Sequence, residues 1–187
     1  MTTTLSVDLF ISMDGFAGSD GLPGYFGYFG PDLGAWIEDS AAPTVSLMGR
    51  RTYETLASLP EEHRDEGWQE MARLETVVFS HTLDRVEWPN ARICRDDLGG
   101  EVERLKASSE VPLRTVGSLS VARQVINAGL VDRLRLMTFP LFAGPDGREP
   151  AFTGVASTDL ELVDHQVLDG RVLLIEYRPT GHDIPRS

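Results

Sequence analysis

The chain has 187 residues, which suits a single domain that can bury a core without disulfides or a structural metal. Its 29 acidic residues outnumber its 17 basic ones, and the formal net charge of −12 argues against nucleic acid and anionic membrane surfaces as partners. Cys94 is the only cysteine, which excludes an internal disulfide and the usual structural zinc patterns.

The start of the chain and the spread of its histidines bear on location and on metals. Met1 leads into an apolar strand pattern without the basic and apolar regions of a secretory signal, so we expect a cytoplasmic protein. The four histidines lie far apart in the sequence without paired spacing, so we expect no metal site.

A strand is predicted at residues 5–11, where apolar and polar side chains alternate. Glycines end this pattern, and residues 18–30 then combine several glycines with the rings of Tyr25, Phe26 and Phe29. Glycine gives a loop mobility and rings give it a surface for a flat ligand, so this segment is interpreted as an active-site lid. The alternative is an irregular loop packed on the core.

A short helix is predicted from Pro31, because Leu33, Trp36 and Ile37 then share one helical face. Asp32 has two interpretations. It could cap the helix by accepting a backbone N–H, which is the common use of Asp before such a run. Its apolar neighbours also suit a carboxyl group whose pKa is raised toward the range in which it can supply a proton.

Two adjacent arginines open the helix predicted over residues 49–59, directly after an apolar strand. The amino-terminal end of a helix carries partial positive charge, so Arg50 and Arg51 are unfavourable there unless an anion binds. Gly49 lets the backbone approach such a ligand, and guanidinium groups can fork onto phosphate oxygens. The stretch from Gly49 to Thr52 is therefore either a phosphate-binding site or a solvated helix start.

Two further strand ends carry small or hydrogen-bonding residues. They are Ser80, His81 and Thr82 after the strand predicted at 76–79, and Gly117 and Ser118 after the strand predicted at 113–116. The carboxyl ends of strands in an open α/β sheet meet at one edge, where nucleotides bind. Three such junctions together predict a nucleotide-binding edge.

The remaining segments predict elements to which we assign no chemistry. They are a strand at 91–94, helices at 98–107 and from residue 119, and a long strand at 131–142 followed by a turn. Asp169-Gly170 joins two extended runs, at 160–168 and 171–177, and gives the strongest hairpin signal in the chain. One domain is expected over residues 1–178, with a loosely ordered polar tail at 179–187.

Taken together, four of these segments resemble the dihydrofolate reductase superfamily. They are Pro31-Asp32-Leu33 with Trp36, the run from Met48 to Glu54, Ser80-His81-Thr82, and the helix led by Gly117. Three others are more similar to stand-alone bacterial relatives of the riboflavin-biosynthesis reductase (RibD C-terminal) domain. They are residues 12–16, 128–134 and 139–144.

The resemblance implies a three-layer α/β fold, with a mainly parallel central sheet that ends in an antiparallel hairpin and with NADPH along its carboxyl edge. The residues matched to the family would hold the cofactor: Gly49, Arg50, Arg51 and Thr52 at its phosphates, with Arg51 near the 2′-phosphate, Ser80, His81 and Thr82 at the adenosine, Gly117, Ser118, Leu119 and Ser120 at the pyrophosphate, and Ala17 and Gly18 at the nicotinamide. Ser118 and His81 depart from the family, which usually has glycine and arginine there.

The resemblance also makes Asp32 the proton source and places Asp14, Phe29, Trp36 and Phe139 around the substrate. The implied function is an NADPH-dependent reductase that transfers a hydride to a flat heterocycle of the pterin or riboflavin-precursor pyrimidine class. The alternative is a non-catalytic nucleotide-binding or assembly module that retains the cofactor site. A small-molecule substrate is expected, and a homodimer is allowed because relatives often pair.

Overall fold

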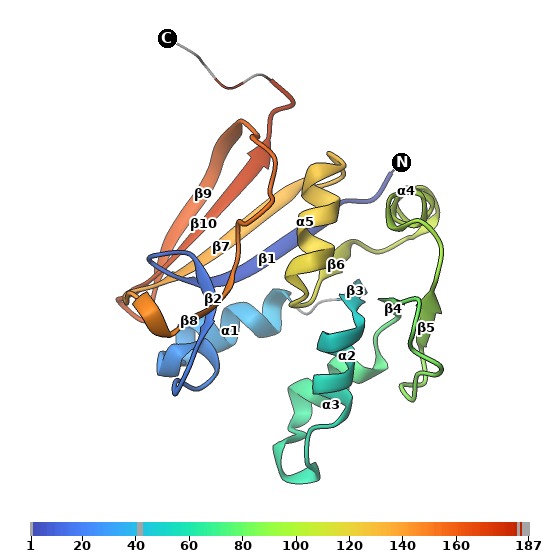
Figure 1. The fold of residues 1–187 in the computed structure, drawn as a ribbon, viewed down its shortest axis with the longest axis horizontal. Coiled ribbons are helices and arrows are strands. Elements are labelled where there is room, and N and C mark those ends of the chain that lie inside the picture. Colours follow the sequence, from blue (N-terminus) through green and yellow to red (C-terminus); the bar gives the residue numbers. More distant parts are fainter. Residues whose placement is uncertain (1, 41–42, 183, 185–187) are drawn as a thin grey trace.

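A central sheet of eight strands organises the chain, as shown by a computed structural model that describes residues 2–40, 43–182 and 184 (Figure 1). The strand order is β5-β4-β3-β6-β1-β7-β10-β9, in which the first six strands are parallel and the last two antiparallel. The strands are β1 (Leu5–Ser12), β3 (Val45–Gly49), β4 (Thr76–Phe79), β5 (Ala91–Cys94), β6 (Leu113–Thr115), β7 (Arg133–Phe139), β9 (Leu160–Leu168) and β10 (Val172–Pro179).

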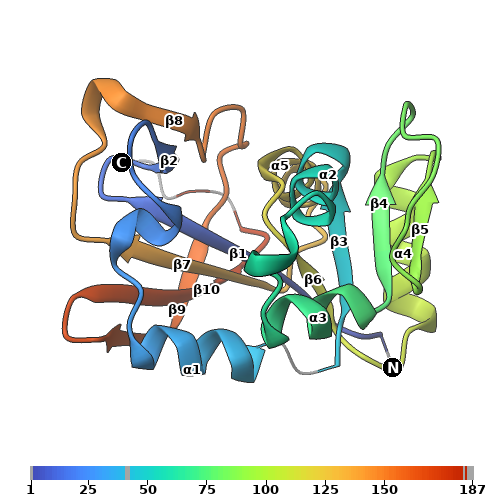
Figure 2. The same ribbon diagram turned by 90° about the horizontal axis from the view of Figure 1, so that it is seen from below.

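Helices lie on both faces of this sheet, and a short antiparallel ribbon lies at its carboxyl edge. The ribbon pairs β2 (Phe16–Ser19) with β8 (Gly147–Pro150). The helices are α1 (Pro31–Ser40), α2 (Arg50–Ala57), α3 (Glu66–Arg73), α4 (Leu98–Ser108) and α5 (Leu119–Asn127). Figure 2 shows α1 and α3 on one side of the strands and α5 on the other.

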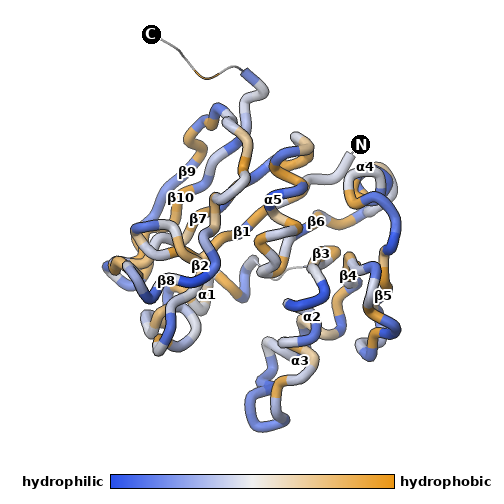
Figure 3. The backbone as a smooth tube through the Cα atoms, in the orientation of Figure 1, coloured by the Kyte–Doolittle hydropathy of each residue, from blue (hydrophilic) through white to orange (hydrophobic). Residues whose placement is uncertain are grey.

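The alternation of side chains along β1 divides the core between the two faces. Leu5 and Val7 are fully buried in the cluster that α4 and α5 cover. Phe10 points the other way, toward the cluster built on Phe139 and on Leu33 of α1. Figure 3 shows the hydrophobic colour along the central strands. Burial on both faces explains why the parallel strands read as apolar, β-branched runs in the sequence.

The structure shortens one predicted strand and lengthens another. β7 ends at Phe139, because Pro140 has no N–H for the ladder. β10 continues through Pro179, and the N–H of Thr180 donates to the Asp159 carbonyl, so the start of the predicted loose tail is paired. The His182 N–H also donates to Thr180 Oγ1 at 3.0 Å, and residues 183 and 185–187 of the predicted tail lie outside the described residues.

Part of the aromatic loop packs on the core, and the lid interpretation stays a prediction. Phe26 is buried, with its ring centroid 5.5 Å from that of Phe139, and Tyr25 lies edge-on to Phe10 at 5.3 Å. Both loop residues adopt positive φ, at 55° and 51°, but only Phe26 is buried, because 38% of Tyr25 is exposed. Phe26 is therefore buried by the hydrophobic effect, and Tyr25 packs its ring against Phe10.

The hairpin turn caps α1 from a distant part of the chain. Asp169 accepts hydrogen bonds from the backbone N–H groups of Asp32 at 2.9 Å and Leu33 at 3.1 Å. In return, the Asp32 carboxylate accepts the Asp169 N–H at 2.9 Å. The free N–H groups of the first helical turn are thus satisfied by the β9–β10 turn, which fixes α1 to the sheet edge.

We predict that Asp169→Ala lowers the free energy of unfolding by about 1–2 kcal/mol, because it removes a cap and places alanine at a φ of 50°. Equilibrium urea unfolding measures the change. Gln166→Ala in β9, an exposed residue of the same hairpin, is the matched control and should change stability by less than about 0.5 kcal/mol. Equal losses in the two variants would contradict the capping role.

Candidate nucleotide-binding site

The central sheet opens between β1 and β6. β6 pairs with β1 only at Leu5 and Ser6, whereas β7 stays paired with β1 as far as Ser12. The strands separate because β6 ends at Thr115 and the chain then turns into α5. Strand order also reverses here, since β3 lies on one side of β1 and β7 on the other. In open α/β sheets this switch point is where ligands bind.

The α2 helix begins at this edge without an anion of its own. Gly49 offers no side-chain cap, and the first turn contains Arg50 and Arg51 but no acidic residue. Figure 3 shows the start of α2 as strongly hydrophilic beside the apolar strands. The positive helix end and two guanidinium groups therefore act together on the space in front of them.

A single hydroxyl joins the starts of α2 and α5. Ser118 Oγ accepts the Gly49 N–H at 2.7 Å and donates to Thr52 Oγ1 at 2.6 Å. Ser118 and Gly117 both have positive φ, and a Cβ added at Gly117 would lie 3.1 Å from Thr52 Cγ2. The left-handed turn thus brings the two helix starts into contact, and it leaves no room for a side chain at Gly117.

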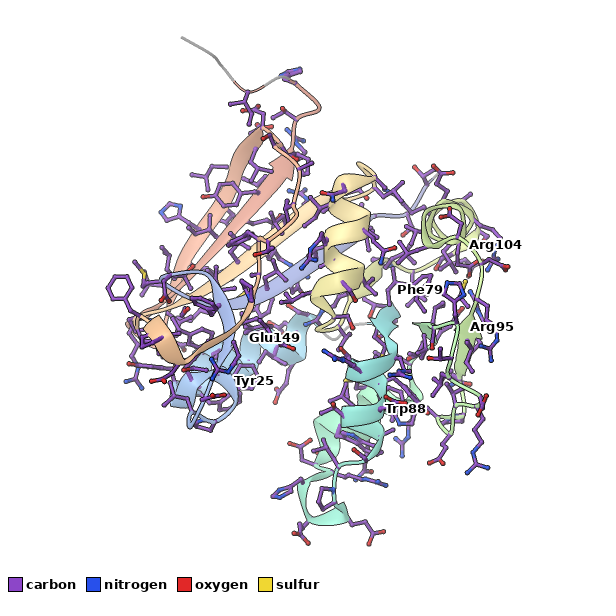
Figure 4. The ribbon with its side chains drawn as sticks, in the orientation of Figure 1. Tyr25, Phe79, Trp88, Arg95, Arg104 and Glu149 are labelled. Atoms are coloured by element: carbon purple, nitrogen blue, oxygen red, sulfur yellow. The ribbon has the colours of Figure 1, made fainter. Side chains whose placement is uncertain are left out.

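A cavity of about 650 Å³ lies between these helix starts and β1, a volume typical of cofactor sites. Its other wall comes from the β2–β8 ribbon and the segment after β8. Figure 4 shows Phe79 and Glu149 on opposite sides of the α2 and α5 starts. The lining residues are Asp8, Leu9, Phe10, Ala17, Arg50, Arg51, Thr52, Phe79, Gly117, Ser118, Leu119, Ser120, Arg123, Glu149, Pro150 and Thr153.

The cavity is locally basic although the protein is acidic. Three of its lining residues are arginines, whereas its only two acids are Asp8 and Glu149. Arg50 is held by its donation to Thr82 Oγ1 at 2.9 Å and by an exposed pair with Glu54 at 3.5 Å. An exposed pair of this kind contributes little, so the guanidinium group stays available to a ligand.

The charge of Asp8 is neutralised inside the protein. Its carboxylate accepts from Arg114 Nε and Arg135 Nε, both at 2.7 Å, and its side chain is only 2% exposed. Arg114 also donates to the Ser40 carbonyl, and Arg135 lies over the Trp36 ring at 5.0 Å. Asp8 is therefore connected to β6 and β7 directly, and to α1 through the two arginines. Glu149 is the other acid of the cavity wall, and it has no such pair of arginine partners among the described residues.

Asp14 holds the ribbon against the sheet. Its carboxylate accepts from the Ser12 hydroxyl at 2.6 Å and from the backbone N–H groups of Ala143 and Gly144 at 2.9 and 2.8 Å. The Ser12 hydrogen bond, followed by these N–H groups, lowers the pKa of Asp14 from 3.8 to about 2. All of these partners stabilise the charged form and join the turn after β1 to the segment after β7.

The depressed pKa of Asp14 predicts a pH dependence of stability. The group stabilises the fold fully above the unfolded pKa near 3.8, and this contribution is lost as pH falls toward the folded value of about 2. We expect the melting temperature of Asp14→Asn to fall less than that of the parent protein between pH 4 and pH 2, roughly the window between the two pKa values. Glu103→Gln on exposed α4 is the control, and parallel curves for parent and Asp14→Asn would refute the assignment.

Of the residues predicted to hold a cofactor, the structure gathers Ala17 of β2 and those at the starts of α2 and α5 around the cavity. Gly49 lies directly behind them, bonded to Ser118. The third junction lies outside. Ser80 Oγ accepts the N–H groups of Thr82 and Leu83, His81 is exposed, and Phe79 lines the cavity instead. Gly18 pairs with Arg148 and is not among the lining residues.

The predicted substrate wall is not assembled at this cavity. Phe139 is completely buried in the core, Phe29 is 58% exposed, and Trp36 lies under Arg135. Asp14 uses its oxygens within the fold, as described above. None of these four residues lines the cavity, and their assignment to a substrate site stays a prediction.

Asp32 is exposed and bonded to the hairpin turn, so the expectation of an apolar pocket around it is wrong. The physical reason is that α1 is packed through Leu33, one residue further on, which turns Asp32 outward. It does not line the cavity. Its carboxylate accepts the Asp169 N–H of the hairpin turn rather than an N–H of its own helix, and its role as proton source stays a prediction.

Sequence reasoning missed the wall made by Arg123, Glu149, Pro150 and Thr153. Arg123 could have been predicted from the sequence, because it follows Ser120 by three residues and therefore shares its helical face. Glu149 has a φ of 58°, a left-handed conformation that re-aims the backbone of β8 and that no local pattern announces. In the described part of the chain, no cluster of three His, Cys, Asp or Glu side chains could hold a metal, and no helix is long and apolar enough to span a membrane.

The family model of the RibD C-terminal domain matches residues 3–174. The chain belongs to this family. It is also 27% identical over 183 residues to the uncharacterized protein YyaP of Bacillus subtilis strain 168, and the match covers 94% of each chain.

Two solved structures show the same fold as this RibD C-terminal domain. A pyrimidine reductase-like protein from Corynebacterium diphtheriae has a TM-score of 0.65 at 17% identity, covering 96% of this chain and 93% of that one. Dihydrofolate reductase from Enterococcus faecalis, solved with NADP(H), has a TM-score of 0.63 at 16% identity, covering 96% and 99%. The predicted dihydrofolate reductase-like fold, with its mainly parallel sheet and terminal hairpin, is thereby confirmed.

Proposed function

We propose that this RibD C-terminal domain protein is an NADPH-dependent reductase of a flat heterocyclic small molecule, of the pterin or pyrimidine class. The observation that carries the proposal is a basic cavity in a protein of net charge −12, built where two helix starts meet an opened sheet. Helix N-termini together with arginines are the standard means of binding phosphates. Membership of the family and the fold shared with reductases support the same proposal.

The residues of the cavity fit a dinucleotide. The backbone N–H groups at the starts of α2 and α5, with Arg50 and Arg51, would bind phosphates, and the absence of a Cβ at Gly117 lets the two helix starts lie close together. Leu9, Phe10 and Ala17 would border the nicotinamide ring at the separation of β1 from β6. When bound, NADPH supplies a hydride, and the protein contributes orientation and exclusion of water.

The wall beside Ala17 is where a substrate would meet the cofactor. Glu149, placed opposite Ala17 by the pairing of β2 with β8, lines this part of the cavity. Its carboxylate can accept hydrogen bonds from ring N–H or exocyclic amino groups, which pterins and aminopyrimidines both carry. We therefore propose Glu149, in place of Asp32, as the acidic group that faces the substrate.

One observation favours a second candidate function, a nucleotide-binding module without catalysis. Asp32, the residue matched to the acid of the reductases, lies exposed in a capping network and away from the cavity. The two functions differ in one measurement. Purified protein is titrated with NADPH and then incubated with a panel of pterins and aminopyrimidines while the nicotinamide absorbance is followed. Binding with oxidation supports the reductase, binding without oxidation supports the module, and no binding refutes both.

A second prediction concerns the choice between nucleotides. Arg51→Ala should weaken NADPH binding by about 10- to 100-fold and NADH binding much less, because hydrogen bonds to charged groups contribute about 1.5–3 kcal/mol and only NADPH carries a 2′-phosphate. Fluorescence titration with each nucleotide gives the two dissociation constants. Arg178→Ala in the terminal hairpin is the control, since that arginine pairs with Glu161 outside the cavity. Equal losses for the two nucleotides would place Arg51 away from the 2′-phosphate.

A further inference from the structure

Arg123 extends the basic lining of the cavity to a second turn of α5. It follows Ser120 by three residues, and both line the cavity, so the helical period places them on one face. Arg50 and Arg51 approach the same space from α2. A ligand between the two helices would therefore meet arginines on both sides.

The position of Arg123 is fixed by the turn that follows β8. Gly154 in this turn has a φ of 77°, and a Cβ added there would lie 3.3 Å from Arg123 Cδ. The turn is bonded to α5 through Asn127, whose Nδ2 donates to the Gly154 carbonyl at 2.9 Å and whose Oδ1 accepts the Ala156 N–H at 2.8 Å. Arg123 is thus held between the helix and the turn.

One atom of this side chain lacks a hydrogen-bond partner. Arg123 Nε is buried, and among the described residues it makes no hydrogen bond. Buried guanidinium N–H groups in proteins are normally paired, because leaving one unpaired costs the full desolvation of a charged donor. Arg123 lines the cavity, so a ligand there could supply its guanidinium group with an acceptor.

We propose that Arg123 binds the diphosphate of a dinucleotide, from the side opposite Arg51. This inference rests on the proposed function and adds a residue to it. The diphosphate fits because its oxygens would lie at the α5 start, one turn from Arg123, and because a guanidinium fork pairs with phosphate oxygens through Nε and Nη. NADPH and NADH share the diphosphate, so Arg123 should contribute equally to the affinity for both nucleotides. Arg51, in contrast, should contribute mainly to the affinity for NADPH.

The test compares Arg123→Gln and Arg123→Lys with the parent protein and with Arg85→Gln, an exposed residue outside this cavity. We expect Arg123→Gln to weaken NADPH and NADH alike by about 10- to 100-fold, as loss of a charge-assisted hydrogen bond predicts. Arg123→Lys keeps the charge without the Nε donor and should give an intermediate loss. Without nucleotide, the melting temperature of Arg123→Gln should not fall, because the lost Nε has no partner to lose.

Thermal shift with inorganic pyrophosphate separates this inference from the proposed function. Pyrophosphate should raise the melting temperature of the parent and of Arg85→Gln but not that of Arg123→Gln. The inference would be overturned if Arg123→Gln kept the parent's nucleotide affinity or lost affinity for NADPH alone. Nucleotide binding by the parent protein would still support the proposed function in that case. Another outcome is that the parent protein binds neither nucleotide and is still stabilised by pyrophosphate through Arg123. That result would support the anion site at Arg123 and refute the proposed reductase function. A lower melting temperature with intact affinity would assign Arg123 a structural role.

Discussion

The Asp8 carboxylate holds three parallel strands together at the place where the sheet opens. Arg114 of β6 and Arg135 of β7 both donate to it, and they also reach α1 through the Ser40 carbonyl and the Trp36 ring. Burying three charges is costly, but once they are buried each depends on the others, since a missing partner leaves an uncompensated charge that costs about 3–5 kcal/mol. These ion pairs therefore connect β1, β6 and β7 beside the opening.

Strained backbone gathers around this opening and is compensated locally. Ser118 adopts a left-handed conformation that costs about 1–2 kcal/mol for a residue with a side chain, and its hydroxyl makes two hydrogen bonds worth about 1 kcal/mol each. A serine in this left-handed position thus forms a bridge between the two helix starts. Glu149 carries the same left-handed strain on the opposite wall, where a carboxylate faces the cavity.

Local signals in the sequence were sufficient for most of the elements, but not for β2, α3 or β8. The apolar runs, the Asp169-Gly170 turn and the arginines after Gly49 each act within a few residues, so the strands of the central sheet, the hairpin and the α2 start were predicted correctly. The contacts of side chains that depend on packing against distant parts of the chain were not predicted correctly. Trp36 and Phe139 were assigned to a ligand wall because aromatic residues suit both ligand binding and core packing. In the structure, Trp36 packs under Arg135 and Phe139 packs in the core. The hydrogen bond of Asp32 was missed because its partner, Asp169, is 137 residues away.

The sequence by itself determined a mainly parallel α/β sheet and predicted a nucleotide-binding edge, because strand periodicity, helix starts and the exclusion of acidic residues from the α2 start are local properties. Only the tertiary structure decided which residues share the cavity. The order of strands carries Ser80 to Thr82 outside it, and the pairing of β2 with β8 brings Glu149 and Thr153 to its wall. Strand order and the docking of loops depend on the summed packing of the whole core, which no short stretch of sequence encodes.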